Sequence, residues 1–174
     1  MDSNFSTDVN NHIRCGPLRV AFLNDQPVAF IAFQLFPKLN ALYLAGMVKK
    51  QSAPSGLVEL IVRDFVKTTD PSILVTRTQN DRVMEIMTHL CDITVPIDRP
   101  ANQTDLNLLN QLSLLTPITD PNTLVIHGCY GSQMIYNLPR RRVYDKKITV
   151  FSDLLDYQSG DAALLIGYRK YEKK

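Results

Sequence analysis

The stretch LYLAGMVKK QSAPSGLVEL IVRDFVKTTD PSILVTRTQN, residues Leu42 to Asn80, decides the fold. Its pattern predicts an apolar strand, a Pro-Ser-Gly turn, an amphipathic helix and a second strand. A Gly-containing turn that leads into a helix leaves the first backbone N–H groups of the helix without intrahelical partners, and the helix dipole favours an anion beside them. The stretch therefore predicts a binding site for a phosphorylated cofactor.

The composition is typical of one globular domain. The chain has 174 residues, of which 45% are hydrophobic, enough for one full core. We expect residues 1–12, rich in Asn, Asp and Ser, to be a disordered arm and residues 13–174 to form a single domain. The formal net charge of +2 gives no global electrostatic signature of binding to a nucleic acid or an acidic membrane.

The cysteines and the apolar runs indicate the compartment. Three cysteines are an odd and sparse set, and no basic segment followed by a signal-type apolar run precedes the first strand. The longest apolar stretches, such as Val28 to Phe36, reach only about half of the roughly 20 residues that a membrane helix needs. We therefore expect a soluble protein of the reducing cytoplasm.

Two β-rich runs precede the central stretch, at Leu18 to Leu23 and at Val28 to Phe36. The turn-forming residues Asn24 to Pro27 join them as antiparallel neighbours. A third strand at Leu42 to Val48 follows the turn at Pro37 to Asn40. The three runs predict an antiparallel meander.

Helices and strands alternate after the meander. The helix at Leu57 to Lys67 has one apolar stripe, and a strand is expected at Ile73 to Thr76. Asn80 or Asp81 caps the next helix, which extends to Leu90. The remaining segments are predicted as a linker at Pro96 to Gln103, helices at Asp105 to Leu115 and Val150 to Tyr157, and strands at Thr123 to Cys129 and Ala162 to Tyr168. This order predicts an α/β fold with a central mixed sheet flanked by helices.

The central stretch resembles the GNAT superfamily of acyl-CoA-dependent N-acetyltransferases, over roughly Leu18 to Cys91. In that family a strand ending in valine leads into Gln/Arg-x-x-Gly-x-Gly/Ala at a helix start, whose amides hold the pyrophosphate of acetyl-CoA. Without gaps, Val48 takes the valine position, Gly56 the first glycine and Leu57 the residue after it. The resemblance implies a GNAT-like fold with shortened N-terminal elements.

Two positions depart from the family motif, because Ala53 stands where Gln or Arg is usual and Val58 where Gly or Ala is usual. A shifted register recovers the polar residue at Gln51 but places Pro54 at the first glycine, so we prefer the gapless register. The resemblance implies acetyl-CoA as the acyl donor. The residues that it implies for cofactor binding are Met47, Val48, Ala53, Ser55, Gly56, Leu57, Val58 and Asn80.

Asn80 takes the position at which many family members carry an Asn that hydrogen-bonds the pantetheine arm of the cofactor. An ordinary N-cap explains Asn80 almost as well, and both interpretations stay open. Met87 stands where the family often carries a tyrosine that protonates the departing thiolate, and methionine cannot donate a proton. Further segments are similar to a longer-tailed GNAT branch of unassigned substrate: Tyr130-Gly131-Ser132, Asn137-Leu138-Pro139 and Gly160-Asp161-Ala162.

The resemblance implies an acyltransferase that transfers the acetyl group directly to an amine, on a small molecule or a protein, without a covalent enzyme intermediate. We expect a backbone N–H near Met47 or Val48 to polarise the acetyl carbonyl. The candidate catalytic residues are Glu59, His127, Tyr130 and Tyr136. One alternative is an inactive acyl-CoA-binding module. Another is an interaction protein whose open sheet edge takes a partner strand or a second copy, as a homodimer.

Two further patterns carry ligand chemistry. His89-Leu90-Cys91 and His127-Gly128-Cys129 contain zinc-ligand residue types, but residues two apart on a helix point about 200° apart, and only the second pair would share a strand face. We therefore expect no metal. The basic cluster Arg140 to Arg142 could contact the 3′-phosphate of CoA or a nucleic acid, although a solvated loop is the interpretation that we favour.

Overall fold

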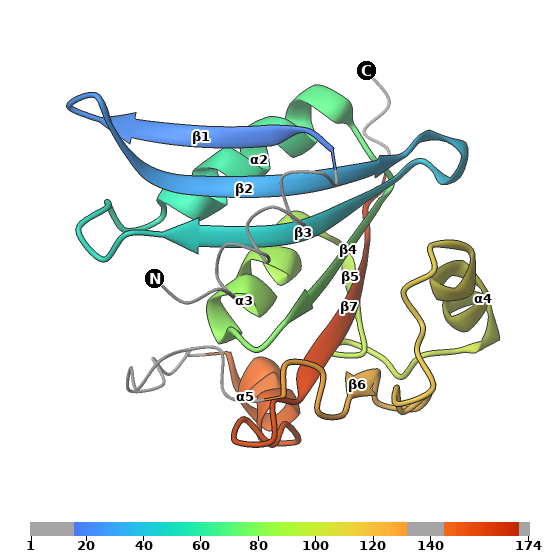
Figure 1. Cartoon of the computed structure of the whole chain (residues 1–174). Helices are drawn as coiled ribbons and strands as arrows, with labels where there is room; N and C mark the ends of the chain where they lie inside the picture. Colours follow the sequence, from blue (N-terminus) through green and yellow to red (C-terminus); the bar gives the residue numbers. More distant parts are fainter. Residues whose placement is uncertain (1–15, 132–144, 171–174) are drawn as a thin grey trace. The chain divides into compact units, whose positions relative to one another are not determined.

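The computed structural model describes residues 16–131 and 145–170, and the chain divides into two compact units, residues 1–73 and 74–174 (Figure 1). The expected disordered arm, residues 1–12, lies outside the described residues. That residues 13–174 form a single domain stays a prediction. The order of helices and strands along the chain confirms the expected α/β class.

The first unit contains the predicted antiparallel meander. Strand β1 (Leu18–Leu23) pairs with β2 (Gln26–Phe36), and β2 pairs with β3 (Ala41–Lys49), both antiparallel. Asn24 and Asp25 both have left-handed φ values, 49° and 59°, as a two-residue hairpin turn requires. The turn between β2 and β3 is a short 3-10 helix, η1 (Pro37–Leu39), which ends at the left-handed Asn40.

A bulge interrupts the pairing of β2 with β3. Ala32 pairs with Gly46 and Phe33 pairs with Leu44, so Ala45 has no partner in the register. An extra residue of this kind bends the strand and disturbs the ladder of hydrogen bonds locally. The bulge lies at the middle of β3, four residues before the strand ends at Lys49.

Helix α2 (Leu57–Thr69) packs against β2 within the first unit. Its buried residues are Val62, Phe65 and Val66, which follow the apolar stripe expected from the sequence. The ring of Phe65 stacks on that of Phe33 with the centroids 4.1 Å apart, and the Arg19 guanidinium lies 4.7 Å from the Phe65 ring centroid. These aromatic contacts fix the helix on the sheet.

The second unit is built around β7 (Ala162–Tyr168), whose residues are buried from Ala162 to Gly167. It lies between β4 (Ile73–Thr78) and β5 (Ile93–Val95), and β6 (Val125–Ile126) also pairs with it. A strand buried on both faces is expected to be a continuous apolar run, as this one is. The helices of this unit are α3 (Asp81–Leu90), α4 (Gln103–Gln111) and α5 (Lys146–Ser152).

A buried carboxylate attaches α4 to the end of β7. The Asp105 side chain has no exposed surface and accepts two hydrogen bonds from Arg99, at 2.6 and 3.0 Å, and one from the Tyr168 hydroxyl at 2.6 Å. It also accepts from the Asn102 amide, completing a capping box. Burial raises the pKa of Asp105, but these hydrogen bonds outweigh it and hold the pKa below the usual range.

The predicted bounds of several elements in the second unit were wrong. The predicted helix Val150 to Tyr157 is instead α5, which begins earlier because the Asp145 carboxylate caps it by accepting from the Lys147 amide. The predicted strand Thr123 to Cys129 shortens to β6, since Leu124 and Gly128 adopt left-handed φ on either side of it. Helix α4 begins at Gln103 and ends before Leu115, and β5 was not predicted. Each helix within the described residues is too short or too polar to cross a lipid bilayer.

Candidate functional site

The turn after β3 is closed by a lysine. Lys49 donates from Nζ to the Ala53 carbonyl at 2.9 Å, and the Ala53 amide donates to the Lys50 carbonyl at 3.1 Å. Ala53 is buried, so it shapes the turn where a Gln or Arg was implied by the resemblance. Met47 and Val48 pair with β2 opposite Ile31 and Phe30, and Val48 is 45% exposed. Lys49 and Lys50 place two positive charges at this turn, which sequence reasoning overlooked although they directly follow the strand.

Gly56 opens α2 in a left-handed conformation, with φ of 78°. A Cβ added to Gly56 would meet nothing within 4 Å, so the space in front of it is open. Ser55 and Gly56 are exposed, whereas Leu57 and Val58 are half-buried. The start of α2 therefore presents its backbone to open space.

Within the described residues, helix α2 of the first unit begins without the side-chain cap that the helices of the second unit have. Asn80, Asn102 and Asp145 each accept a backbone amide at the starts of α3, α4 and α5. In the described part of the chain, no side chain caps α2 in this way. The Leu57 amide donates to the Pro54 carbonyl at 3.4 Å. The next amides of a helix start have no intrahelical partner, so an external acceptor or water suits them.

Glu59, a candidate catalytic base, is engaged on its own helix. Its carboxylate lies 2.9 Å from the Arg63 guanidinium one turn later. An acidic side chain in the first turn also interacts favourably with the helix dipole. The structure thus gives Glu59 a local role in α2.

Asn80 is the N-cap of α3, so the ordinary cap interpretation is confirmed. Its Oδ1 accepts from the Arg82 amide at 2.9 Å, and its own amide donates to the Thr78 hydroxyl at 2.9 Å. The cap uses only the oxygen of the side chain, and Asn80 is an exposed residue. Capping is therefore compatible with hydrogen bonding from Nδ2 to a ligand.

Met87, at the position where the family often has tyrosine, is completely buried in the second unit. Its neighbours include Gly167 of β7, where an added Cβ would lie 3.2 Å from the Met87 methyl group. A fully buried thioether serves the packing of α3. No proton donor replaces it at that position.

Tyr130 and Arg77 form a pair beside the end of β4. The Tyr130 hydroxyl donates to the Arg77 carbonyl at 3.3 Å, and the Arg77 guanidinium lies 5.5 Å from the Tyr130 ring centroid. The nearby Gln79 is buried and donates from Nε2 to the Asp161 carbonyl at 2.7 Å. These contacts hold the loop after β6 and the start of β7 against the end of β4.

His127 lies in this loop, and its Nδ1 is 3.1 Å from the Asp161 Oδ2. The imidazole is 62% exposed, whereas the Asp161 side chain is only 5% exposed. Burial raises the pKa of Asp161, but hydrogen bonds from the Gly128 and Asp156 amides and from His127 lower the pKa below its usual range. Sequence reasoning named His127 and missed Asp161, although an acid directly before a buried strand was a usable signal.

The structure does not describe every sequence candidate. Tyr136 and the Arg140 to Arg142 cluster lie outside the described residues. His127 and Cys129 were expected to share a strand face, but β6 ends at Ile126 and Gly128 is left-handed, so that expectation was wrong. Burial raises the pKa of the Cys129 thiol. Within residues 16–131 and 145–170, no three His, Cys, Asp or Glu side chains gather as metal ligands would.

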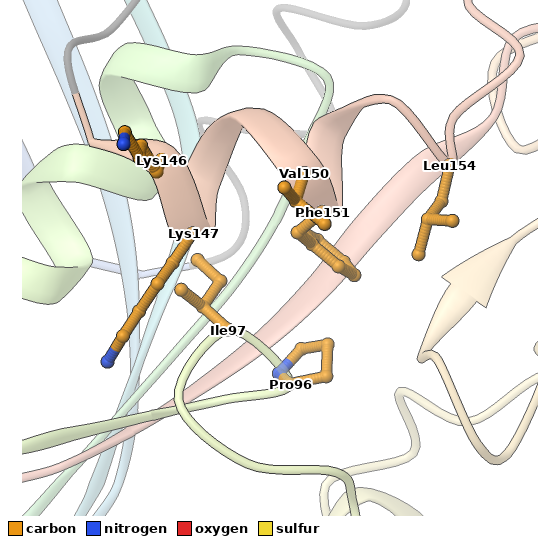
Figure 2. A pocket seen from close by; sticks show the side chains of 7 residues that line it. All are labelled: Pro96, Ile97, Lys146, Lys147, Val150, Phe151 and Leu154. Atoms are coloured by element: carbon orange, nitrogen blue, oxygen red, sulfur yellow. The ribbon is translucent and has the colours of Figure 1, made fainter.

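A shallow apolar groove lies beside α5 (Figure 2). Pro96, Ile97, Val150, Phe151 and Leu154 line it together with Lys146 and Lys147. Lys147 donates from Nζ to the Asp98 carboxylate at 2.7 Å, which ties α5 to the segment after β5. Lys147 is thus engaged within the protein.

Comparison with known proteins finds no matching family model and no matching curated protein. Among solved structures, the chain is similar to a Bacillus subtilis acetyltransferase in complex with CoA, at 9% identity and a TM-score of 0.49, over 97% of this chain and 86% of that one. An IAA acetyltransferase from Bacillus cereus is 10% identical, with a TM-score of 0.46, over 95% and 86% of the two chains. A GNAT family acetyltransferase from Elizabethkingia anophelis with acetyl-CoA bound is 12% identical, with a TM-score of 0.42, over 96% and 83%.

Proposed function

We propose that this chain is an acetyl-CoA-dependent N-acetyltransferase, an acyltransferase that passes the acetyl group directly to an amine. The observation that carries the proposal is the start of α2, where a left-handed Gly56 with open space before it leads into a helix that no described side chain caps. Backbone amides with an aligned helix dipole suit a pyrophosphate. Lys49 and Lys50 add positive charge at the same turn.

The strand before this turn suits the acetyl end of the donor. We expected a backbone N–H near Met47 or Val48 to polarise the acetyl carbonyl. Ala45, which has no partner in the register with β2, lies two residues before Met47. We therefore assign the polarising backbone N–H to the bulge at Ala45. A donor preorganised towards developing negative charge stabilises the transition state of acyl transfer.

Within the second unit, we propose Asn80 as a residue that contacts the cofactor. Its Oδ1 caps α3, and its Nδ2 donors are suited to the amide carbonyls of a pantetheine arm. The enzyme would contribute chiefly by positioning, which supplies roughly 7–11 kcal/mol in the best intramolecular models. The free thiols of Cys91 and Cys129 are compatible with the cytoplasm, where we place the reaction.

The test compares two asparagine caps by calorimetric titration with acetyl-CoA. Asn80→Ser keeps a capping oxygen but removes the Nδ2 donors, and Asn102→Ser makes the same change at the start of α4. Losing one net hydrogen bond of about 0.5–1.5 kcal/mol should raise the Kd of Asn80→Ser about 2- to 10-fold. Asn102→Ser should bind as the wild type does. Equal affinities of all three proteins, or no binding at millimolar acetyl-CoA, would contradict the proposal.

Activity is tested by free-thiol release from acetyl-CoA with a panel of amines. An amine that raises the rate above background hydrolysis supports the transferase. Met87 favours a second candidate, an acyl-CoA-binding module without turnover, because the buried thioether offers no proton to a departing thiolate. Binding of acetyl-CoA without release of thiol for any amine would favour that module.

A further inference from the structure

His127 and Asp161 form a pair in which a buried carboxylate orients an exposed imidazole. Asp161 Oδ2 lies 3.1 Å from His127 Nδ1 and accepts from the Asp156 amide at 3.2 Å. Oδ1 accepts from the Gly128 amide at 2.9 Å and from the Ser159 hydroxyl at 3.1 Å. Four donors from two segments, the loop after β6 and the loop before β7, thus fix the carboxylate. The Gly128 hydrogen bond also fixes the backbone next to His127.

The tautomer of the imidazole follows from this geometry. Because the hydrogen bonds of Asp161 favour its ionised form, the carboxylate only accepts, and Nδ1 of His127 must carry the hydrogen. In the neutral ring the lone pair is then on Nε2. The His127 side chain is 62% exposed, and Nε2 is the ring nitrogen that does not face Asp161. An orienting acid behind an accessible imidazole is the arrangement of a general base.

The pair lies at the carboxyl end of β4, within the second unit. Gln79, which directly follows that strand, donates to the backbone carbonyl of Asp161 at 2.7 Å. Asn80, the residue assigned to the pantetheine arm, is next in the chain. The loop after β6, which contains His127, is also held to β4, because the Tyr130 hydroxyl donates to the Arg77 carbonyl at 3.3 Å. The pair and the proposed cofactor contact therefore belong to one end of one strand.

We propose that His127 is the general base of the acyl transfer and that Asp161 is its positioning residue, an inference that rests on the proposed function. Nε2 takes a proton from the substrate amine as the new C–N bond forms. The C–S bond of the thioester breaks, and the CoA thiolate leaves with its electron pair and takes a proton from water. The protonated imidazole then returns its proton to solvent, so that protons and charge balance.

The first measurement concerns the imidazole itself and needs no substrate. Nitrogen-15 NMR of the full chain should show His127 as the Nδ1–H tautomer in its neutral form. His89, exposed in the last turn of α3, is the reference histidine. Asp161→Asn should lose this preference. A neutral His127 protonated on Nε2 in the wild type would overturn the proposal.

The second measurement is kinetic, with acetyl-CoA and the amine panel. His127→Gln should lower kcat about 100-fold or more with little change in the KM for acetyl-CoA, because a general base contributes about 10²–10⁴-fold. Asp161→Asn should also lower kcat, by up to about 10⁴-fold where the tautomer of the imidazole is lost. His89→Gln should keep the kcat of the wild type. Because Asp161 is buried, Asp161→Asn is the variant that could misfold. The variants of the exposed His127 therefore decide the test. Imidazole in the buffer should restore part of the kcat of His127→Ala, which a purely structural role would not allow.

The two ways of failing are distinct. No turnover by the wild type with any amine overturns the proposed transferase and the base role with it. Turnover that His127→Gln leaves unchanged overturns the base role alone, and the transferase stands. Loss of kcat in His127→Ala without rescue by imidazole also contradicts a role for Nε2 in proton transfer.

Discussion

Replacing Gly56 by alanine tests two features of this residue, its left-handed conformation and the open space in front of it. A left-handed conformation costs a residue with a Cβ about 1–2 kcal/mol. The smaller entropy of the unfolded alanine chain returns about 0.4–1 kcal/mol. Because an added Cβ would meet nothing within 4 Å, no steric cost is expected. Gly56→Ala should therefore lower the free energy of unfolding by about 1 kcal/mol.

The effect on acetyl-CoA binding should be larger than this loss of stability suggests. The new methyl group would stand in the open space before the α2 amides, where the pyrophosphate is proposed to approach the backbone. We expect the Kd for acetyl-CoA to rise about tenfold or more, which corresponds to about 1.4 kcal/mol. Gly131→Ala is the matched control, because Gly131 is also left-handed, with φ of 67°, and also has nothing within 4 Å of an added Cβ.

The assay combines urea unfolding with calorimetric titration of both alanine variants. Gly56→Ala and Gly131→Ala should lose similar stability at an unchanged m-value, and only Gly56→Ala should lose affinity. A neutral or stabilising Gly56→Ala would refute the left-handed conformation. A loss above about 3 kcal/mol would refute the open space, since it would require a clash or overpacking. Equal affinities of the two variants would refute the role of Gly56 in binding.

Three further predictions concern the second unit. Asp105→Asn should lower the free energy of unfolding in urea by about 3 kcal/mol, because the Arg99 and Tyr168 donors would then face a neutral amide in place of a buried carboxylate. Tyr168→Phe, which removes only one of these donors, should lower it by less than half as much. Because the pKa of Asp105 is lowered in the folded state, its contribution is present above about pH 4 and is lost as the pH falls through the folded pKa. Acid unfolding curves of Asp105→Asn should therefore be flatter than those of the wild type below about pH 4, and parallel curves would contradict this. Gly167→Ala should cost about 1–3 kcal/mol because its Cβ would clash with the Cys91 side chain, and the double variant with Cys91→Ala should recover part of the loss, whereas additive losses would contradict the contact.

Local patterns predicted the elements whose causes are local. Leu18–Leu23 and Ala162–Tyr168 have the predicted bounds, since each is a β-rich run between turn residues or an unbroken apolar run. The start of α3 was predicted from Asn80, because a capping side chain acts within its own turn. The start of α2 was predicted from Gly56, where the chain needs a left-handed residue.

Features that depend on contacts distant in sequence were not predictable in this way. The bulge at Ala45 depends on the register of two strands, and no residue in β3 predicts it. Asp161 and His127 are 34 positions apart, so only the folded chain shows that they form a pair. The short β5 was missed because three residues carry no readable period, and its pairing with β7 defines it.

Nitrogen-15 amide NMR during titration with acetyl-CoA tests the central claim most directly. If acetyl-CoA binds as proposed, the backbone amides of Gly56, Leu57 and Val58 should shift along one binding curve. Amides of α4 should stay unchanged, which would show that the shifts are local. Unchanged amides at the start of α2 with millimolar acetyl-CoA, or shifts confined to other parts of the chain, would contradict the claim.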